Sequence, residues 1–117
     1  MENRRKKGAK YEERAAEYLE GLGWRILERN YRCRRGEIDL IAADGQTLVF
    51  VEVKYRRSDT YGSPAEAVDG RKQRTICRVA DHYRMCHGVL EGQACRFDVI
   101  SVQGEELSLL QDAFPYQ

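Results

Sequence analysis

Two apolar segments that should form core strands carry acidic residues, and this feature constrains the fold of the chain most. The first segment is Gly36–Ala42 and the second is Leu48–Lys54. An ionised carboxylate in a low-dielectric interior is very costly unless it is paired or binds a metal ion. Because side chains alternate along a strand, Asp39, Glu52 and Lys54 can all lie on one face of a hairpin. The sequence therefore predicts a bound cation and chemistry that uses it.

The turn between the two segments sets how their acidic residues face each other. Asp44-Gly45 is a strong signal for a two-residue hairpin turn of type I′. With this turn, Asp39 faces Phe50, and Glu52 becomes its diagonal neighbour at about 7–8 Å. A longer loop would instead put Asp39 directly opposite Glu52. Either register keeps the two carboxylates on one face.

Hydrophobic periodicity predicts one α/β domain across the 117 residues. Both faces of Leu48–Lys54 are largely apolar, so this segment is predicted to be a central strand covered on both sides. The predicted helices run from about Ala9 to Glu20 and from about Ala65 or Gly70 to Met85. The other predicted strands are Trp24–Asn30, Cys95–Val102 and a short edge strand within Glu105–Gln111.

The predicted helices add further candidates for the site. Glu12 continues the apolar stripe formed by Ala16 and Leu19, so its carboxylate is predicted to point inward. The alternative is a glutamate near the helix start that is favoured by the helix dipole. Lys72 and Gln73 lie just before the buried stripe of the second helix. They either reach over the site or cap the exposed edge of the helix, and the second interpretation is favoured.

Charge alternates in four blocks along the chain, although its net charge is only +1. The blocks carry +5, −4, +4 and −4 in residues 1–36, 37–53, 54–78 and 79–117. An acidic segment between two basic ones suits a phosphate polymer that crosses a metal site and is held by Lys and Arg. Charge runs are more often solvated faces, and Arg4–Lys7 alone favours that simpler interpretation.

Two basic segments are candidates for contact with nucleic acid. Residues 1–7 are predicted to be a polar arm, and residues 56–64 a mobile loop at the mouth of the site. We expect this loop to become ordered on nucleic acid, because it combines arginines with Tyr61 for base stacking. An ordinary flexible connection is the alternative. The candidate contact residues are Arg4, Arg5, Lys6, Lys7, Lys10, Arg56, Arg57, Tyr61, Lys72 and Gln73.

Composition argues against several other classes of protein. A hydrophobic fraction of 42% with clear periodicity argues against disorder. The chain has no apolar run long enough to cross a membrane, so we expect no membrane partner and a cytoplasmic location. The four cysteines lack the spacing of a zinc site and are expected to be reduced thiols.

Two sequence blocks, Gly36–Ala42 and Val49–Lys54, are specific when they occur together at this spacing. With them the chain resembles the PD-(D/E)XK nuclease superfamily. More closely, it resembles the YraN-like family of small bacterial proteins, related to archaeal Holliday-junction resolvases. The resemblance implies a restriction-endonuclease-like αβββαβ core, with a mixed central sheet flanked by helices. Ile38 stands where the superfamily name implies proline, as is usual for this branch. The resemblance extends through Gly8, Glu12, Ala15, Ala16, Tyr18, Leu19 and Arg96–Ile100.

The resemblance also implies a site that uses Mg²⁺ or Mn²⁺ to hydrolyse phosphodiester bonds in DNA, including branched or repair and recombination intermediates. Asp39 and Glu52 would be direct metal ligands, with the backbone carbonyl of Val53 as a third. Glu12 would complete the site directly or through a water. Lys54 would orient or help to deprotonate the attacking water, or stabilise charge on the phosphorane.

Two other classes of function stay open at this point. A nucleic-acid-binding module could retain the nuclease fold without cleaving. An interaction subunit could use the acids only in buried ion pairs, but the acid–acid–lysine set argues against it. Resolvase relatives act as dimers, so the resemblance also implies a possible homodimer.

Overall fold

The computed structural model describes residues 4–56 and 68–117, with side chains from Ala9 onward. Helix α1 (Arg4–Gly21) is followed by three strands, β1 (Arg25–Cys33), β2 (Gly36–Asp44) and β3 (Thr47–Arg56). Helix α2 (Gly70–Cys86) then leads to β4 (Cys95–Gln103) and β5 (Glu106–Leu110). The five strands form one sheet in chain order. All neighbours are antiparallel except β3 and β4, so the predicted mixed sheet flanked by helices is confirmed.

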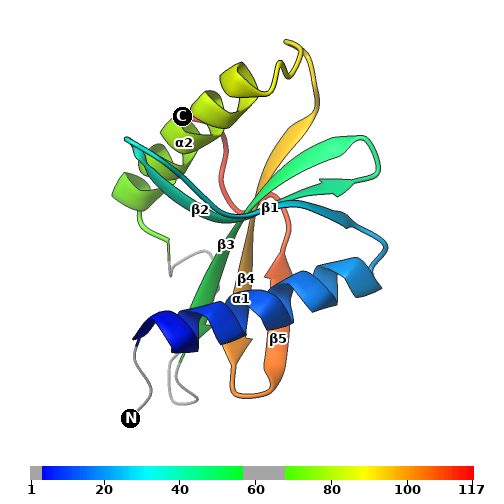
Figure 1. Ribbon diagram of the computed structural model, residues 1–117, viewed down its shortest axis with the longest axis vertical. Helices are drawn as coiled ribbons and strands as arrows, with labels where there is room; N and C mark the ends of the chain where they lie inside the picture. The colour runs from blue at the N-terminus through cyan, green and yellow to red at the C-terminus, as the bar shows by residue number, and fades with distance from the viewer. Residues whose placement is uncertain (1–3, 57–67) are drawn as a thin grey trace.

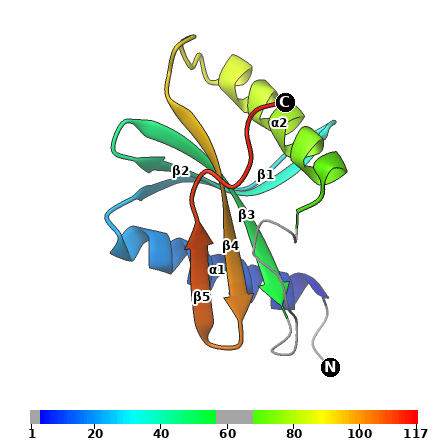
Figure 2. The ribbon, with the colours of Figure 1, turned by 180° about the vertical axis from the view of Figure 1, so that it is seen from behind.

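Each helix covers one side of the sheet and closes its own apolar core. Helix α1 packs on the sheet through Ala15, Ala16 and Leu19. Their partners in the strands are Leu40, Val49, Val51 and Ile100. On the other side, Ile76, Val79 and Tyr83 of α2 pack with Ile41, Phe50, Phe97 and Val99. Figures 1 and 2 show α1 crossing one face of the sheet, in front of the strands in one view and behind them in the other. Because β3 is apolar on both faces, it lies at the centre of this sandwich, as the sequence predicts.

The hairpin register differs from the one that the Asp44-Gly45 signal predicts. Asp44 pairs with Thr47, and the pairing continues through Ile41 opposite Phe50. The turn residues are therefore Gly45 and Gln46, with Gly45 at φ +60°. A type II′ turn needs glycine at its first central position, and Gly45 provides it. The turn therefore differs from the predicted type I′ turn. The prediction that Asp39 faces Phe50 is wrong.

Two predicted boundaries are also wrong. Helix α1 begins at Arg4, so residues 4–7 are helical rather than part of a polar arm. Arg and Lys are good helix formers, and they extend the helix upstream of Gly8 despite a cost of about 1 kcal/mol for that glycine. Strand β1 runs on to Cys33 because Tyr31 pairs with Ile38 of β2.

Asn30 lies within β1 and has an unusual backbone conformation for a strand. Its backbone has φ +53°, a left-handed conformation that asparagine tolerates better than most residues. The ladder pairs Arg29 with Leu40 and Tyr31 with Ile38, so Asn30 lies opposite Asp39. Among the described residues, no helix is both long and apolar enough to span a membrane, and the four cysteines are free.

Candidate functional site

The shifted turn brings the acidic side chains of β2 and β3 together. Pairing of Leu40 with Val51 makes Asp39 and Glu52 the next facing positions along the hairpin. Their carboxyl groups share a hydrogen bond, and the backbone N–H of Val53 donates a 2.8 Å hydrogen bond to Oδ2 of Asp39. Glu52 is only 7% exposed. The two acids therefore share one face, as predicted, and they lie closer together than in the predicted diagonal arrangement.

Helix α1 adds a third carboxyl group to this pair. Glu12 is half-buried and shares hydrogen bonds with Asp39 and with the side chain of Asn30. One residue before it, the ring of Tyr11 stacks on Tyr55 of β3 with centroids 4.4 Å apart. This stacking holds the first half of α1 over the end of β3. The inward orientation predicted for Glu12 matches its position, whereas Glu13, Glu17 and Glu20 are exposed.

The three carboxyl groups hold their protons more tightly than exposed acids do. Burial and the neighbouring Asp39 together raise the pKa of Glu52 to about 8, although Lys72 opposes the shift. Burial and Asp39 likewise raise the pKa of Glu12 to about 7. Burial also raises the pKa of Asp39, against the hydrogen bond from Val53. Near neutral pH the cluster therefore keeps a proton between its members or needs a cation to ionise fully.

A second buried acid, Asp98, is paired with an arginine, unlike the three clustered carboxyl groups in the described part of the chain. Asp98 of β4 is 1% exposed, and Arg96 donates to both of its oxygens at 2.9–3.2 Å. The backbone N–H of Asp112 donates a further hydrogen bond to it. Glu52 has no arginine partner among the described residues. The acid cluster formed by Glu12, Asp39 and Glu52 thus differs from a buried ion pair, because no arginine balances its charge among the described residues.

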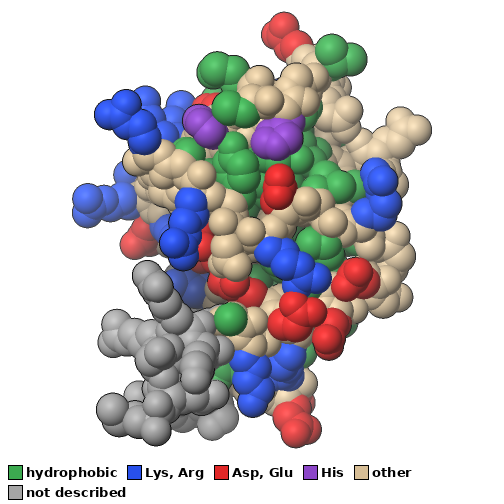
Figure 3. Space-filling view, viewed as in Figure 1, with side chains coloured by type: hydrophobic (Ala, Val, Ile, Leu, Met, Phe, Trp, Pro, Cys, Tyr) green, Lys and Arg blue, Asp and Glu red, His purple; other side chains and the backbone are tan. Residues whose placement is uncertain are grey.

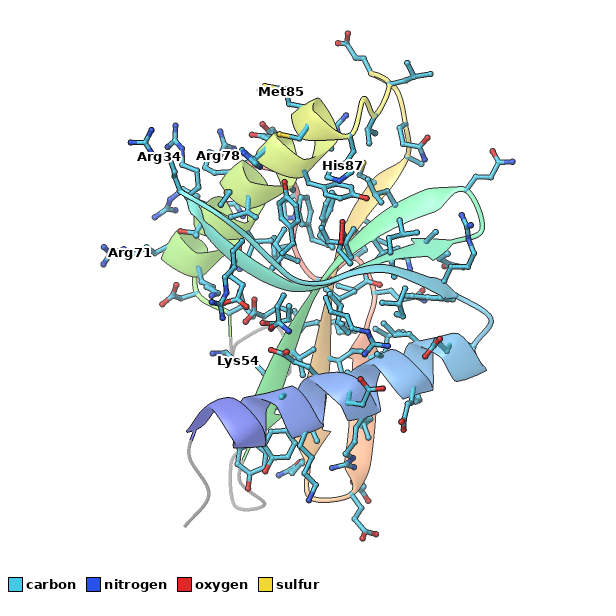
Figure 4. The ribbon with its side chains drawn as sticks, viewed as in Figure 1. Arg34, Lys54, Arg71, Arg78, Met85 and His87 are labelled. Atoms are coloured by element: carbon cyan, nitrogen blue, oxygen red, sulfur yellow. The ribbon has the colours of Figure 1, made fainter. Side chains whose placement is uncertain are left out.

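Two lysines lie beside the acid cluster. The ammonium of Lys72, from α2, is 3.9 Å from Oε1 of Glu52, and its side chain is 42% exposed. Lys54 follows Glu52 by two residues on β3, and its charge also lowers the pKa of Glu52. Figure 4 places Lys54 on the same side of the molecule as Arg71, which precedes Lys72. Lys72 therefore reaches over the site, although the sequence favours the helix-edge interpretation.

Of the other predicted contact residues, Gln73 bonds elsewhere, Lys10 and Arg56 lie at or near the surface, and the rest lie outside the described residues. Gln73 donates to the backbone oxygen of Val68 at 2.9 Å and accepts from Gln117 at 2.6 Å. Its side chain therefore links the start of α2 to these two residues. Lys10 is exposed on α1, and Arg56 is half-buried at the end of β3. Outside the described residues are Arg57, Tyr61 and the side chains of Arg4, Arg5, Lys6 and Lys7.

The donor set suits a hard divalent cation with few protein ligands. Mg²⁺ prefers oxygen and is usually bound through one or two carboxylates with several waters, which Asp39 and Glu52 could provide. Within residues 4–56 and 68–117, no group of three or more His, Cys, Asp or Glu is arranged to enclose a metal ion. A bound ion would thus need a backbone oxygen or waters beside the two strand carboxylates.

Comparison with known proteins finds matches over most of the chain. The model of the family described as "Uncharacterised protein family UPF0102" matches residues 11–102. A UPF0102 protein of Moorella thermoacetica is 52% identical over 99 residues, which cover 85% of this chain and 82% of the relative. One from Lachnoclostridium phytofermentans is 46% identical over 112 residues, or 96% and 95% of the two chains. The matched range contains the whole acid cluster and both lysines.

Proposed function

We propose that this chain, which belongs to the uncharacterised protein family UPF0102, is a metal-dependent nuclease that hydrolyses phosphodiester bonds in DNA. The observation that carries the proposal is the acid cluster itself. Three carboxyl groups from α1, β2 and β3 meet beside two lysines, and among the described residues none of the three acids has an arginine partner like that of Asp98. A cluster that holds its protons so tightly gains most from a divalent cation.

The cation would be Mg²⁺ or Mn²⁺, held by Asp39 and Glu52 with the backbone carbonyl of Val53. When bound, such an ion acidifies a water and neutralises charge on the scissile phosphate. The hydrogen bond from Val53 to Asp39 keeps that carboxylate turned toward Glu52. Glu12 would complete the site, directly or through a water, from the helix that Tyr11 fixes on Tyr55.

The two lysines would hold the substrate and its developing charge. Lys54 shares its face of β3 with Glu52, so its ammonium can orient the attacking water or contact the phosphate. Lys72 reaches the same carboxylate from α2, and its 42% exposed side chain can turn from Glu52 to a phosphate. Positively charged groups aimed at a phosphate stabilise the charge that develops during phosphodiester hydrolysis.

The test is an assay of the purified protein on duplexes, four-way junctions, flaps, single strands and RNA. Each substrate is incubated with Mg²⁺, with Mn²⁺ and with EDTA. We expect cleavage of at least one DNA substrate with either ion and none with EDTA. Binding without cleavage under every condition would contradict the nuclease and support a non-catalytic binding module instead.

A further inference from the structure

A groove beside α2 is lined by arginines that the acid cluster does not use. It encloses about 460 Å³, and its described lining contains no acidic side chain. Figure 3 shows Lys and Arg side chains gathered along one edge of the molecule, and Figure 4 labels Arg34, Arg71 and Arg78 there. The lining residues are Arg35, Arg71, Arg74, Thr75, Arg78 and Gln117.

Three of these arginines form a single stripe on α2. Arg71, Arg74 and Arg78 are spaced by three and four residues, so they share one side of the helix. At 1.5 Å of rise per residue, the stripe is about 10 Å long. One strand of duplex DNA advances about 3.4 Å per nucleotide along the duplex axis, so the stripe is long enough to contact more than one phosphate.

The opposite wall of the groove comes from the turn between β1 and β2. Gly36 lies so close to α2 that a Cβ atom there would be 2.8 Å from Cγ2 of Thr75. Its backbone also has φ +151°, an angle that residues other than glycine rarely adopt. This close approach places Arg35, the preceding residue, across from the α2 stripe.

Most of the charge in the groove lacks a carboxylate partner. Arg35, Arg71 and Arg74 form no ion pair with any described residue. Arg78 lies 3.6 Å from Asp81 and stacks over the ring of Tyr116 at 5.3 Å. Guanidinium groups that repel one another across a groove are stabilised by a polyanion, and their fork geometry matches phosphate.

We propose that this groove binds the phosphate backbone of a duplex arm of the nucleic acid. The inference rests on the proposed function for the identity of the polyanion. Lys72 joins the two regions, because it follows Arg71 and its ammonium is 3.9 Å from Glu52. A backbone in the groove would therefore continue toward the acid cluster. Binding of single strands relies on aromatic stacking, and the described lining of the groove has no aromatic residue, which favours a duplex.

The experiment measures duplex binding by fluorescence anisotropy in EDTA, so that cleavage is not required. The variants are Arg71→Gln, Arg74→Gln and the double variant, each checked by thermal melting. The matched control is Arg25→Gln, since Arg25 is exposed at the other end of β1, opposite Ala43. We expect each single groove variant to make the salt slope shallower by about 0.9 and to lower affinity at low salt by about tenfold, and the double variant to make the slope shallower by about 1.8. Arg71→Lys and Arg74→Lys should keep the wild-type slope.

The outcomes separate this inference from the proposed function. If both glutamine variants bind duplex as the wild type does, the groove is not the binding site, even where the wild type cleaves DNA. If duplex binding depends on the groove arginines but no metal ion supports cleavage, the groove is confirmed as the binding site and the nuclease proposal fails. A wild type that binds no duplex, or binds single strands more tightly through the same arginines, would overturn the inference.

Discussion

The backbone N–H of Val53 donates a 2.8 Å hydrogen bond to Oδ2 of Asp39, which joins the acid of β2 to the backbone of β3. The same bond holds Asp39 beside Glu52, the residue that precedes Val53. It opposes the rise in the pKa of Asp39 that burial causes. Asp39 is thus held in place by the sheet, and burial raises its pKa as it does those of Glu52 and Glu12.

Glu52→Gln should stabilise the metal-free protein at alkaline pH. The pKa of Glu52 is raised from 4.5 to about 8, so the folded state binds the proton more tightly than the unfolded state. The stability from this group is complete below about pH 4.5 and is lost as pH rises to about 8. In EDTA at pH 8.5, we expect the variant to unfold at a higher urea concentration than the wild type, with the difference shrinking as the pH falls toward 4.5. Urea unfolding at several pH values checks this, and parallel pH profiles for both proteins would contradict it.

Arg96→Met should have the opposite effect on stability. It leaves Asp98 buried without its charged partner, which costs about 3 kcal/mol or more. Urea unfolding at pH 7 measures the loss. A variant as stable as the wild type would show that the hydrogen bond from Asp112 suffices for Asp98, and the contrast drawn between the two buried acids would fail.

Asn30 should be sensitive to substitution because of its conformation. Asn30→Ala keeps a side chain at φ +53° and removes the hydrogen bond to Glu12, so we expect a loss of about 1–2 kcal/mol. Asn30→Gly loses the same hydrogen bond but adopts this φ freely, and it should be the more stable of the two. Equal stabilities in chemical denaturation would argue against a strained backbone at Asn30.

Several features of the site follow directly from the sequence. Alternation along β3 predicts Glu52 and Lys54 on one face, and the helical spacing of Glu12, Ala16 and Leu19 predicts an inward carboxylate. The family of uncharacterised bacterial proteins is also predictable, since the two sequence blocks lie inside the matched residues 11–102. The two side-chain orientations depend on local periodicity, and the family depends on the two sequence blocks. A single sequence displays both.

Other features depend on contacts between distant segments. The Asp44-Gly45 pair cannot indicate which of its neighbours completes the turn, so the register was predicted wrongly. Asparagine tolerates a left-handed backbone, but nothing local to Asn30 indicates that it adopts one inside a strand. The arginine groove joins α2 to the β1–β2 turn, and only the packing of Gly36 on Thr75 reveals it. The four cationic residues at the start of α1 are compatible with either an arm or a helix.

Gly36→Ala should test that packing. The added methyl group would meet Cγ2 of Thr75 at 2.8 Å, and φ +151° is strained for alanine, so we expect a loss of about 2 kcal/mol. Thr75→Ser removes the opposing methyl group and should recover part of the loss. A double-mutant cycle by urea unfolding measures this coupling, expected at about 1 kcal/mol. Additive effects would show that the two residues are not in contact.

Metal-dependent cleavage by point variants tests the nuclease assignment most directly. The wild type, Glu52→Gln and the surface control Glu17→Gln are compared on the best DNA substrate with Mg²⁺ or Mn²⁺, under single-turnover conditions. Glu17 is exposed on the same helix as Glu12, so its loss should leave the site intact. We predict that Glu52→Gln cleaves at least a hundredfold more slowly, about 3 kcal/mol of lost transition-state stabilisation, while Glu17→Gln matches the wild type. Equal cleavage by all three proteins would contradict the assignment of the acid cluster as the active site.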